Sequence, residues 1–296
     1  MGNILTKQFY RQRKDFEDSC AGRDAGLTFP EGVRCSTDIA YADDGIKAHM
    51  LDIYRPEDSQ EKILPVIINV HGGGLIIGNK EFNRYFCALL CKKGFLVYSI
   101  EYRLIPDCLM YDQISDVYMA MDYIKERLAA DGGDSSHVYM AGDSGGACLI
   151  TYANAIQNST NIARAANVTP SGLRINALGL ISGMFYTSRF DKIGLFLPKY
   201  LYGRDYKKTS FAKYVNPENR ELLNSLAPVW LVTSHNDFLR RYTTDFEKAL
   251  TRAEREHELV AFSKNKKLTH AFSVFEPFLP ESSEVIDMMV EYFRKF

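Results

Sequence analysis

An apolar run, "LPVIINV" at Leu64–Val70, places the strongest constraint on the fold of this chain. A strand with so little polar character must be covered on both faces, which is typical of the interior of a parallel sheet. Because parallel strands are joined by crossover connections, helices must pack on that sheet. The run passes directly into His71, Gly72, Gly73 and Gly74, so a glycine loop follows the carboxyl end of this strand.

Strand and helix patterns alternate along the rest of the chain. Alternating polarity predicts half-buried antiparallel strands at residues 36–42 and 49–54, separated by a turn at Asp43-Asp44-Gly45. Further strands are expected at residues 95–100, 137–141, 175–181, Val229–Ser234 and 259–262, and helices at residues 1–28, 83–93, 112–130, 242–257 and 283–295. We therefore predict an α/β fold in one domain over residues 1–296, with a mainly parallel central sheet and helices on both faces.

The composition is that of an ordinary globular chain with a substantial core, since 46% of its 296 residues are hydrophobic and 25% are charged. A net charge of −1 offers no general attraction for nucleic acid. No stretch approaches the ~18 uninterrupted apolar residues of a spanning helix, so we expect no integral membrane segment. The sequence leaves the oligomeric state open, a homodimer included.

The N-terminus, "MGNILTKQFYRQRKDF", favours a cytoplasmic location because it lacks the long apolar segment of a secretory signal. Gly2 and Thr6 fit a myristoylation pattern. We favour an amphipathic helix instead, with an apolar stripe formed by Ile4, Leu5, Phe9 and Phe16. Without a signal sequence, the six cysteines are expected to be reduced and structural, and they show no zinc-like pairing with histidine.

The stretch "MAGDSGGACL", residues 140–149, surrounds Ser144 with glycines. A strand pattern precedes Ser144, and helical spacing follows it at Cys148, Leu149, Tyr152 and Ile156. So short a strand-to-helix turn forces unusual backbone angles and leaves little space for neighbouring side chains. It lifts the serine hydroxyl clear of the sheet, beside the free N–H groups of a helix N-terminus. Ser144 is therefore our candidate nucleophile.

The glycine loop after Leu64–Val70, "HGGGLIIGN", is suited to stabilising an oxyanion. Acyl transfer places negative charge on a carbonyl oxygen, and glycines let backbone N–H groups approach that oxygen closely. The loop lacks the spacing of the common phosphate-binding motifs. His71, which opens the loop together with Gly72, is expected to shape it through side-chain hydrogen bonds.

A serine nucleophile needs a base, and that base needs an orienting acid. We assign His49 and His137 to strands and His257 to the end of a helix. His235 precedes the best candidate acid in the chain. His270, in the loop "KLTHAFSVF", is the remaining histidine. Asp237 lies just past the buried run Val229–Ser234. The chain order Ser144, Asp237, His270 is that of α/β-hydrolases.

These motifs together resemble the hormone-sensitive-lipase-like branch of the α/β-hydrolase family. The loop from His71 to Gly74 matches its HGGG motif, and residues 142–146 match its GDSAGG elbow with Gly145 in place of the usual alanine. Residues 102–106, "YRLIP", resemble its YRLAP segment. The family's D-P-L-x-D motif appears here as "DFLRR" from Asp237, and its H-G-F motif as "HAF" from His270.

The resemblance implies a serine carboxylesterase that hydrolyses small to medium acyl esters without a metal or organic cofactor. It assigns the catalytic triad to Ser144, Asp237 and His270, and the oxyanion hole to the N–H groups of Gly73, Gly74 and Gly145. It also implies a cap made by the N-terminus, about residues 1–35, and by an insertion at residues 183–225, whose many aromatic residues fit a lid over a pocket. Amide or peptide hydrolysis on the same triad, and a non-catalytic small-molecule receptor on the same scaffold, stay open as alternatives.

Overall fold

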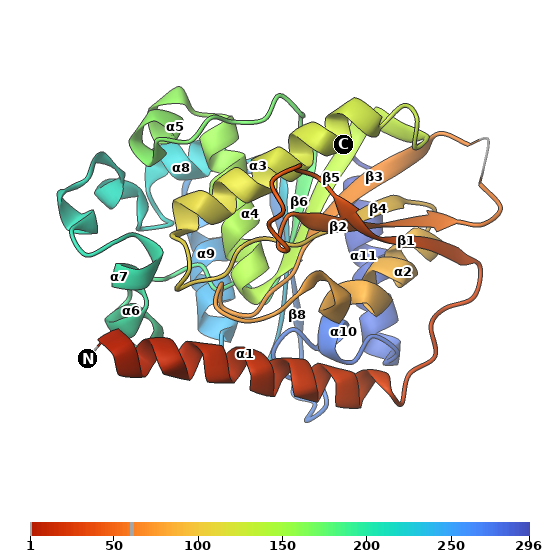
Figure 1. Ribbon diagram of the computed structural model, residues 1–296, viewed down its shortest axis with the longest axis horizontal. Helices are drawn as coiled ribbons and strands as arrows, with labels where there is room; N and C mark the ends of the chain where they lie inside the picture. The colour runs from red at the N-terminus through yellow and green to blue at the C-terminus, as the bar shows by residue number, and fades with distance from the viewer. Residues whose placement is uncertain (1, 60–61) are drawn as a thin grey trace.

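The computed structural model describes residues 2–59 and 62–296 and is built around an eight-stranded sheet in the order β1-β2-β4-β3-β5-β6-β7-β8 (Figure 1). The strands are β1 (Val33–Ala40), β2 (Met50–Pro56), β3 (Leu64–Val70), β4 (Leu96–Ile100), β5 (Gly133–Asp143), β6 (Ala177–Ile181), β7 (Val229–Ser234) and β8 (His257–Phe262). β2 pairs antiparallel with β1 and β4, and every other pairing is parallel. The mainly parallel sheet predicted from the sequence is confirmed.

The position of β3 explains its unbroken apolar character. It lies between β4 and β5, with Ile67 beside both Val97 and Tyr139. Successive side chains of a strand point to opposite faces. Ile67 therefore enters one hydrophobic core and Ile68 enters the other. No face of β3 meets water, so no alternation of polar residues is required.

Helices cover both faces of the sheet (Figure 1). One core is formed with α3 (Met110–Arg127), α4 (Ser144–Gln157), α5 (Thr160–Ala166), α8 (Arg220–Asn224) and α9 (Arg240–Arg252). The opposite core is formed with α2 (Arg84–Lys92), α10 (Phe272–Phe275) and α11 (Pro280–Phe293). The arrangement leaves the carboxyl ends of the parallel strands as the place where loops from both sides meet.

Two further parts of the chain pack around this arrangement. The long helix α1 (Gly2–Asp24) runs along one side of the molecule, past α6 (Lys192–Phe196) and α10 (Figure 1). The segment at residues 183–225 folds into α6, α7 (Pro198–Leu201), two short 3-10 turns (Tyr206–Lys208 and Ser210–Tyr214) and α8. The predicted N-terminal range, residues 1–35, is not all cap, because Val33 already belongs to β1.

The segment at residues 183–225 buries most of its own aromatic residues. The Phe185 ring stacks on Phe246 at 4.2 Å, and the Tyr202 hydroxyl contacts the Thr187 hydroxyl at 2.8 Å. Phe190, by contrast, is 92% exposed. The segment is therefore mainly a packed excursion, with a smaller part, at and around α6, lining a pocket.

The predicted helix at residues 242–257 is wrong at its end. α9 ends at Arg252, and His257 begins β8. Glu254 adopts a left-handed backbone with φ of 53°, and the Arg255 N–H donates to the Leu250 carbonyl at 3.0 Å. This bond closes the helix C-terminus, a termination that the charged sequence did not reveal. His49 likewise lies just before β2 and not within a strand.

All six cysteines are free thiols, and Cys20, Cys87, Cys91 and Cys148 are buried.

Among the helices of the described residues, none combines the length and the apolar character needed to cross a membrane.

Candidate active site

Ser144 sits at a turn with no loop between strand and helix. β5 ends at Asp143, and α4 begins at Ser144 with a left-handed φ of 49°. A Cβ atom added to Gly146 would lie 2.1 Å from the Val70 carbonyl oxygen and 2.5 Å from that of His71. Only glycine fits there, because the helix start presses against the end of β3. The elbow predicted from the sequence is thus formed for the expected steric reason.

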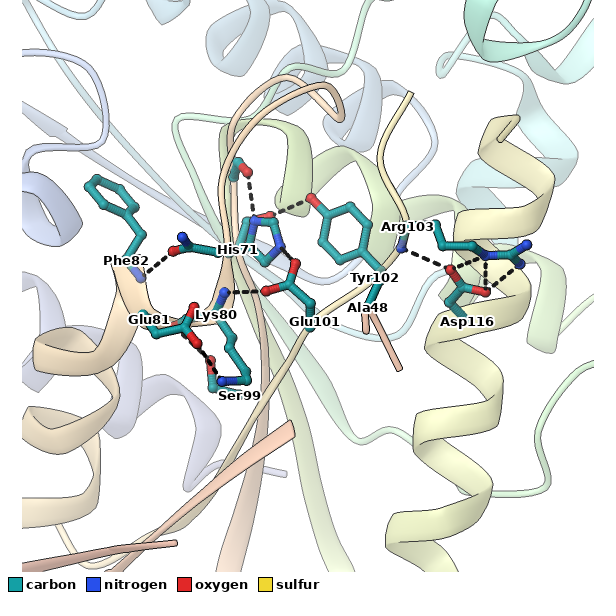
Figure 2. Close-up of polar contacts among 12 residues, drawn as sticks. Ala48, His71, Lys80, Glu81, Phe82, Ser99, Glu101, Tyr102, Arg103 and Asp116 are labelled. Atoms are coloured by element: carbon teal, nitrogen blue, oxygen red, sulfur yellow. Dashed lines mark hydrogen bonds and ion pairs between the residues drawn. The ribbon is translucent and has the colours of Figure 1, made fainter. Parts of the chain in front are cut away.

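The side chain of His71, at the start of the glycine loop, is fully buried and makes several polar contacts (Figure 2). The His71 Nδ1 atom lies 2.8 Å from the Gly72 carbonyl oxygen, and its Nε2 atom lies 3.0 Å from the Glu101 carboxylate. The ring stacks on Tyr102 at 4.3 Å, and the Tyr102 hydroxyl donates to the His71 carbonyl at 2.8 Å. These contacts connect the start of the glycine loop to Glu101 and Tyr102, the residues that follow β4.

The negative charge of Glu101 also acts on the His71 ring. Burial lowers the pKa of His71, but the charge and hydrogen bond of Glu101 outweigh it and raise that pKa above its ordinary value. Both ring nitrogens face oxygen acceptors, so a protonated ring donates to both. On the other side of the loop, the Asp143 carboxylate accepts the Gly72 N–H at 3.0 Å and the Asn83 side-chain amide at 2.9 Å.

Asp237 and His270 form a hydrogen-bonded pair, with 2.7 Å between the Asp237 Oδ1 and His270 Nδ1 atoms. The same carboxylate accepts the Leu239 N–H at 2.8 Å and the Thr233 hydroxyl at 2.9 Å. Burial raises the pKa of Asp237, but the hydrogen bond and charge of His270 lower it below its ordinary value. With Nδ1 held by the acid, Nε2 is the ring nitrogen that can take a proton from a hydroxyl.

Ser144, His270, Gly73 and Gly74 line one cavity of about 560 Å³, although they come from distant parts of the sequence. The rest of the lining is largely apolar and includes Phe9, Phe16, Ile76, Ile77, Met184, Ile193, Phe196, Leu197, Phe238 and Phe275. Within the described residues, the N–H groups of Gly73 and Gly74 donate to no other group. The cavity therefore offers a hydroxyl, a base, two free amide donors and an apolar space for a small molecule.

Several supporting residues were not singled out from the sequence. Glu101 follows the buried strand β4 directly, a position that could have marked it. The Ser182 hydroxyl accepts the Ala271 N–H at 3.1 Å and so holds the residue next to His270. The Phe238 ring packs 4.3 Å from the His270 ring, at the position where the family motif has proline. Among the described residues, no three histidine, cysteine or acidic side chains gather to hold a metal ion.

A family model described as "alpha/beta hydrolase fold" matches residues 67–274, about 70% of the chain. The chain belongs to the α/β-hydrolase family. The resemblance noted in the sequence is therefore confirmed at the level of the family.

Curated relatives of this α/β-hydrolase are similar over only part of their length. A probable isoprenylcysteine alpha-carbonyl methylesterase from rice (Oryza sativa subsp. japonica) is 29% identical over 184 residues, 58% of this chain and 44% of that protein. Esterase LipQ from Mycobacterium tuberculosis is 32% identical over 120 residues, 40% of this chain and 28% of that protein. This chain spans less than half the length of these two relatives.

Among solved structures, this α/β-hydrolase is similar to esterase B from Lactobacillus Rhamnosis inhibited by a C4-C4 SN3 tributyrin phosphonate. The two share a TM-score of 0.92 at 22% identity, over 100% of this chain and 96% of the other. At this identity, the likeness establishes the fold alone.

Proposed function

We propose that this α/β-hydrolase is a serine carboxylesterase that hydrolyses esters with small to medium acyl groups. The observation that carries the proposal is the Asp237–His270 pair at 2.7 Å, opening onto the same apolar cavity as Ser144 and the glycine loop. That the two curated relatives are named an esterase and a methylesterase supports the same reaction type.

The reaction is a two-step acyl transfer. The Ser144 hydroxyl attacks the ester carbonyl while His270 takes its proton, and Asp237 holds the imidazole tautomer and stabilises its charged form. The N–H groups of Gly73, Gly74 and Gly145 hold the oxyanion. His270 returns the proton to the departing alcohol. Water, activated by His270, then releases the acid from Ser144.

In this proposal α1 and part of residues 183–225 form a cap over the substrate. Phe9, Gln12 and Phe16 of α1 line the cavity from one side, and Ile193 and Phe196 of α6 line it from another. The four apolar side chains of this set favour an apolar acyl group and exclude water from the reacting atoms.

The test is Ser144→Ala, assayed with p-nitrophenyl butyrate. We expect kcat to fall by about 10⁴–10⁶-fold, because the nucleophile is lost. A fluorophosphonate or tributyrin phosphonate probe should label the wild-type protein covalently and leave the variant unlabelled. The control is Ser136→Ala, at an exposed position away from the cavity. Wild-type activity in Ser144→Ala would refute the mechanism.

The same experiment separates the alternatives. A non-catalytic receptor would bind small molecules without being labelled by either probe. Comparing a p-nitrophenyl ester with the matching p-nitroanilide distinguishes an esterase from an amidase, and we expect the ester to be the better substrate.

A further inference from the structure

The guanidinium of Arg13, on α1, makes contacts unlike those of an ordinary surface arginine. Its Nε atom donates to the Ile76 carbonyl at 2.8 Å, and its Nη2 atom donates to the carbonyls of Leu104 at 3.0 Å and Ile105 at 2.6 Å. Its Nη1 atom pairs with the Asp107 carboxylate at 2.8 Å. The side chain is only 18% exposed. Arg13 therefore joins α1 to two loops that lie more than sixty residues away in sequence.

The first of these loops carries the proposed oxyanion donors. Ile76, whose carbonyl Arg13 holds, donates its own N–H to the Gly73 carbonyl at 3.1 Å, and the Ile77 N–H reaches the same oxygen at 3.0 Å. Ile76 thus belongs to the same tight turn as Gly73 and Gly74. A displacement of the Ile76 carbonyl would therefore also change the orientation of the Gly73 and Gly74 peptide planes, because the turn joins them.

The second loop is bonded to the first. The Leu75 carbonyl accepts the Ile105 N–H at 3.0 Å and the Gln113 side-chain amide at 3.0 Å. Ile105 also presents its carbonyl to Arg13. The guanidinium therefore restrains the glycine loop at two points. It binds the Ile76 carbonyl directly, and it binds Ile105, whose N–H donates to Leu75 of the loop.

The glycine loop needs such restraint. Gly73 and Gly74 have φ values of 103° and 62°, and glycine has access to far more backbone conformations than any other residue. Donors that are held in place before the reaction stabilise an oxyanion best, since no reorganisation is then required. An arginine can hold several oxygens at once because its five N–H groups form a rigid plane.

We propose that Arg13 is a positioning residue for the oxyanion hole, acting through the carbonyls of Ile76 and Ile105. This inference rests on the proposed function. Arg13 lies outside residues 67–274, the part of the chain that the family model matches. It gives α1 a role in the chemical step beyond that of a wall of the cavity.

The test compares Arg13→Ala with Arg13→Lys and with the control Arg11→Ala. Arg11 is on the same helix, its side chain is 83% exposed, and it forms an ion pair with Asp15 at 3.8 Å. The substrate is p-nitrophenyl acetate, whose short acyl group makes little use of the cap. For Arg13→Ala we expect kcat to fall about 10–100-fold and KM to change less than about threefold. The fall in kcat should be smaller than that caused by removing an oxyanion donor, because the donors are misplaced and not lost.

Two further readouts distinguish positioning from simple anchoring of the helix. Guanidinium ion at millimolar concentration should restore part of the kcat of Arg13→Ala and leave Arg11→Ala unchanged. Arg13→Lys should be intermediate, because an ammonium cannot reach all four oxygens. Asp107→Asn should lower kcat less than about threefold, since the three carbonyl bonds of Arg13 remain.

The inference is overturned if Arg13→Ala keeps its kcat and only raises KM for longer esters, because Arg13 would then merely hold the cap. It is also overturned if Arg13→Lys equals the wild type, a comparison that remains informative should Arg13→Ala fail to fold. Failure of the proposed function looks different: Ser144→Ala would then be as active as the wild type, whatever Arg13 does.

Discussion

The carboxylate of Asp237 is surrounded by hydrogen-bond donors. It accepts hydrogen bonds from His270, Leu239 and Thr233. The sequence made this acid the weakest match to the family motif, since Phe238 stands where proline is usual and Arg241 stands where a second acid is usual. Phe238 instead packs on the His270 ring, so the altered motif still contacts the proposed base.

Replacing this acid by its amide tests the orientation of the base. Asp237→Asn should lower kcat by about 10⁴-fold, because the amide favours the wrong imidazole tautomer. The measurement is kcat on p-nitrophenyl butyrate, with circular dichroism to show that the fold is kept. A loss of less than tenfold would mean that another acid orients His270.

The lowered pKa of Asp237 also makes a prediction for stability. A folded-state pKa below the ordinary 3.8 stabilises the protein above that pH, and the stabilisation is lost as the pH falls through the folded value. The unfolding free energies of wild type and Asp237→Asn should therefore differ most above pH 3.8 and converge as the pH falls below it. Urea titrations at several pH values measure this difference.

At the scale of an element, the turn from β5 into α4 is packed against the glycine loop. A Cβ atom on Gly145 would lie 2.8 Å from the Leu75 nitrogen and 2.9 Å from the Gly74 nitrogen. The related elbow usually carries alanine at this position. In this chain the loop lies too close to accept even one methyl group without moving.

Gly145→Ala should therefore displace the oxyanion donors. We expect kcat to fall by about 10²-fold, the effect of losing one such donor, together with a lower melting temperature. The matched control is Gly22→Ala in α1, where an added Cβ meets nothing within 4 Å and should stabilise the helix by up to about 1 kcal/mol. Undiminished activity in Gly145→Ala would show that the Gly74 N–H does not contribute.

At the scale of the whole molecule, a buried lysine ties the antiparallel edge of the sheet to the active-site side. The Lys80 Nζ atom, just after the glycine loop, lies 2.8 Å from Asp38 of β1, 2.9 Å from Asp52 of β2 and 2.6 Å from Glu81. Burial lowers the pKa of Lys80, but its hydrogen bonds to these acids outweigh that effect and raise it above its usual range. The Lys80 N–H also donates to Glu101, which supports His71 (Figure 2).

Lys80→Met should destabilise the fold by about 3–5 kcal/mol, because the buried Asp52 carboxylate would lose its cation. The control is Lys62→Met, whose side chain is 63% exposed and pairs with Asp58 at 3.9 Å; its effect should be below about 1 kcal/mol. Urea unfolding measures both. Adding Asp52→Asn to Lys80→Met should recover part of the loss, and equal stabilities of Lys80→Met and Lys62→Met would contradict the assignment.

The sequence by itself determined the features that depend on local sterics and on hydrophobic periodicity. It predicted β3 and β7 to the residue, the strand-to-helix turn at Ser144 and the order of the three candidate catalytic residues. These features can be read locally because the pattern of apolar residues and glycines is itself their cause. Only the tertiary structure decided the supporting contacts that the sequence did not single out: Glu101 with His71, Arg13 with Ile76, and Phe238 with His270. Contacts across thirty or more residues depend on how all the elements pack at once, and no local pattern encodes that packing.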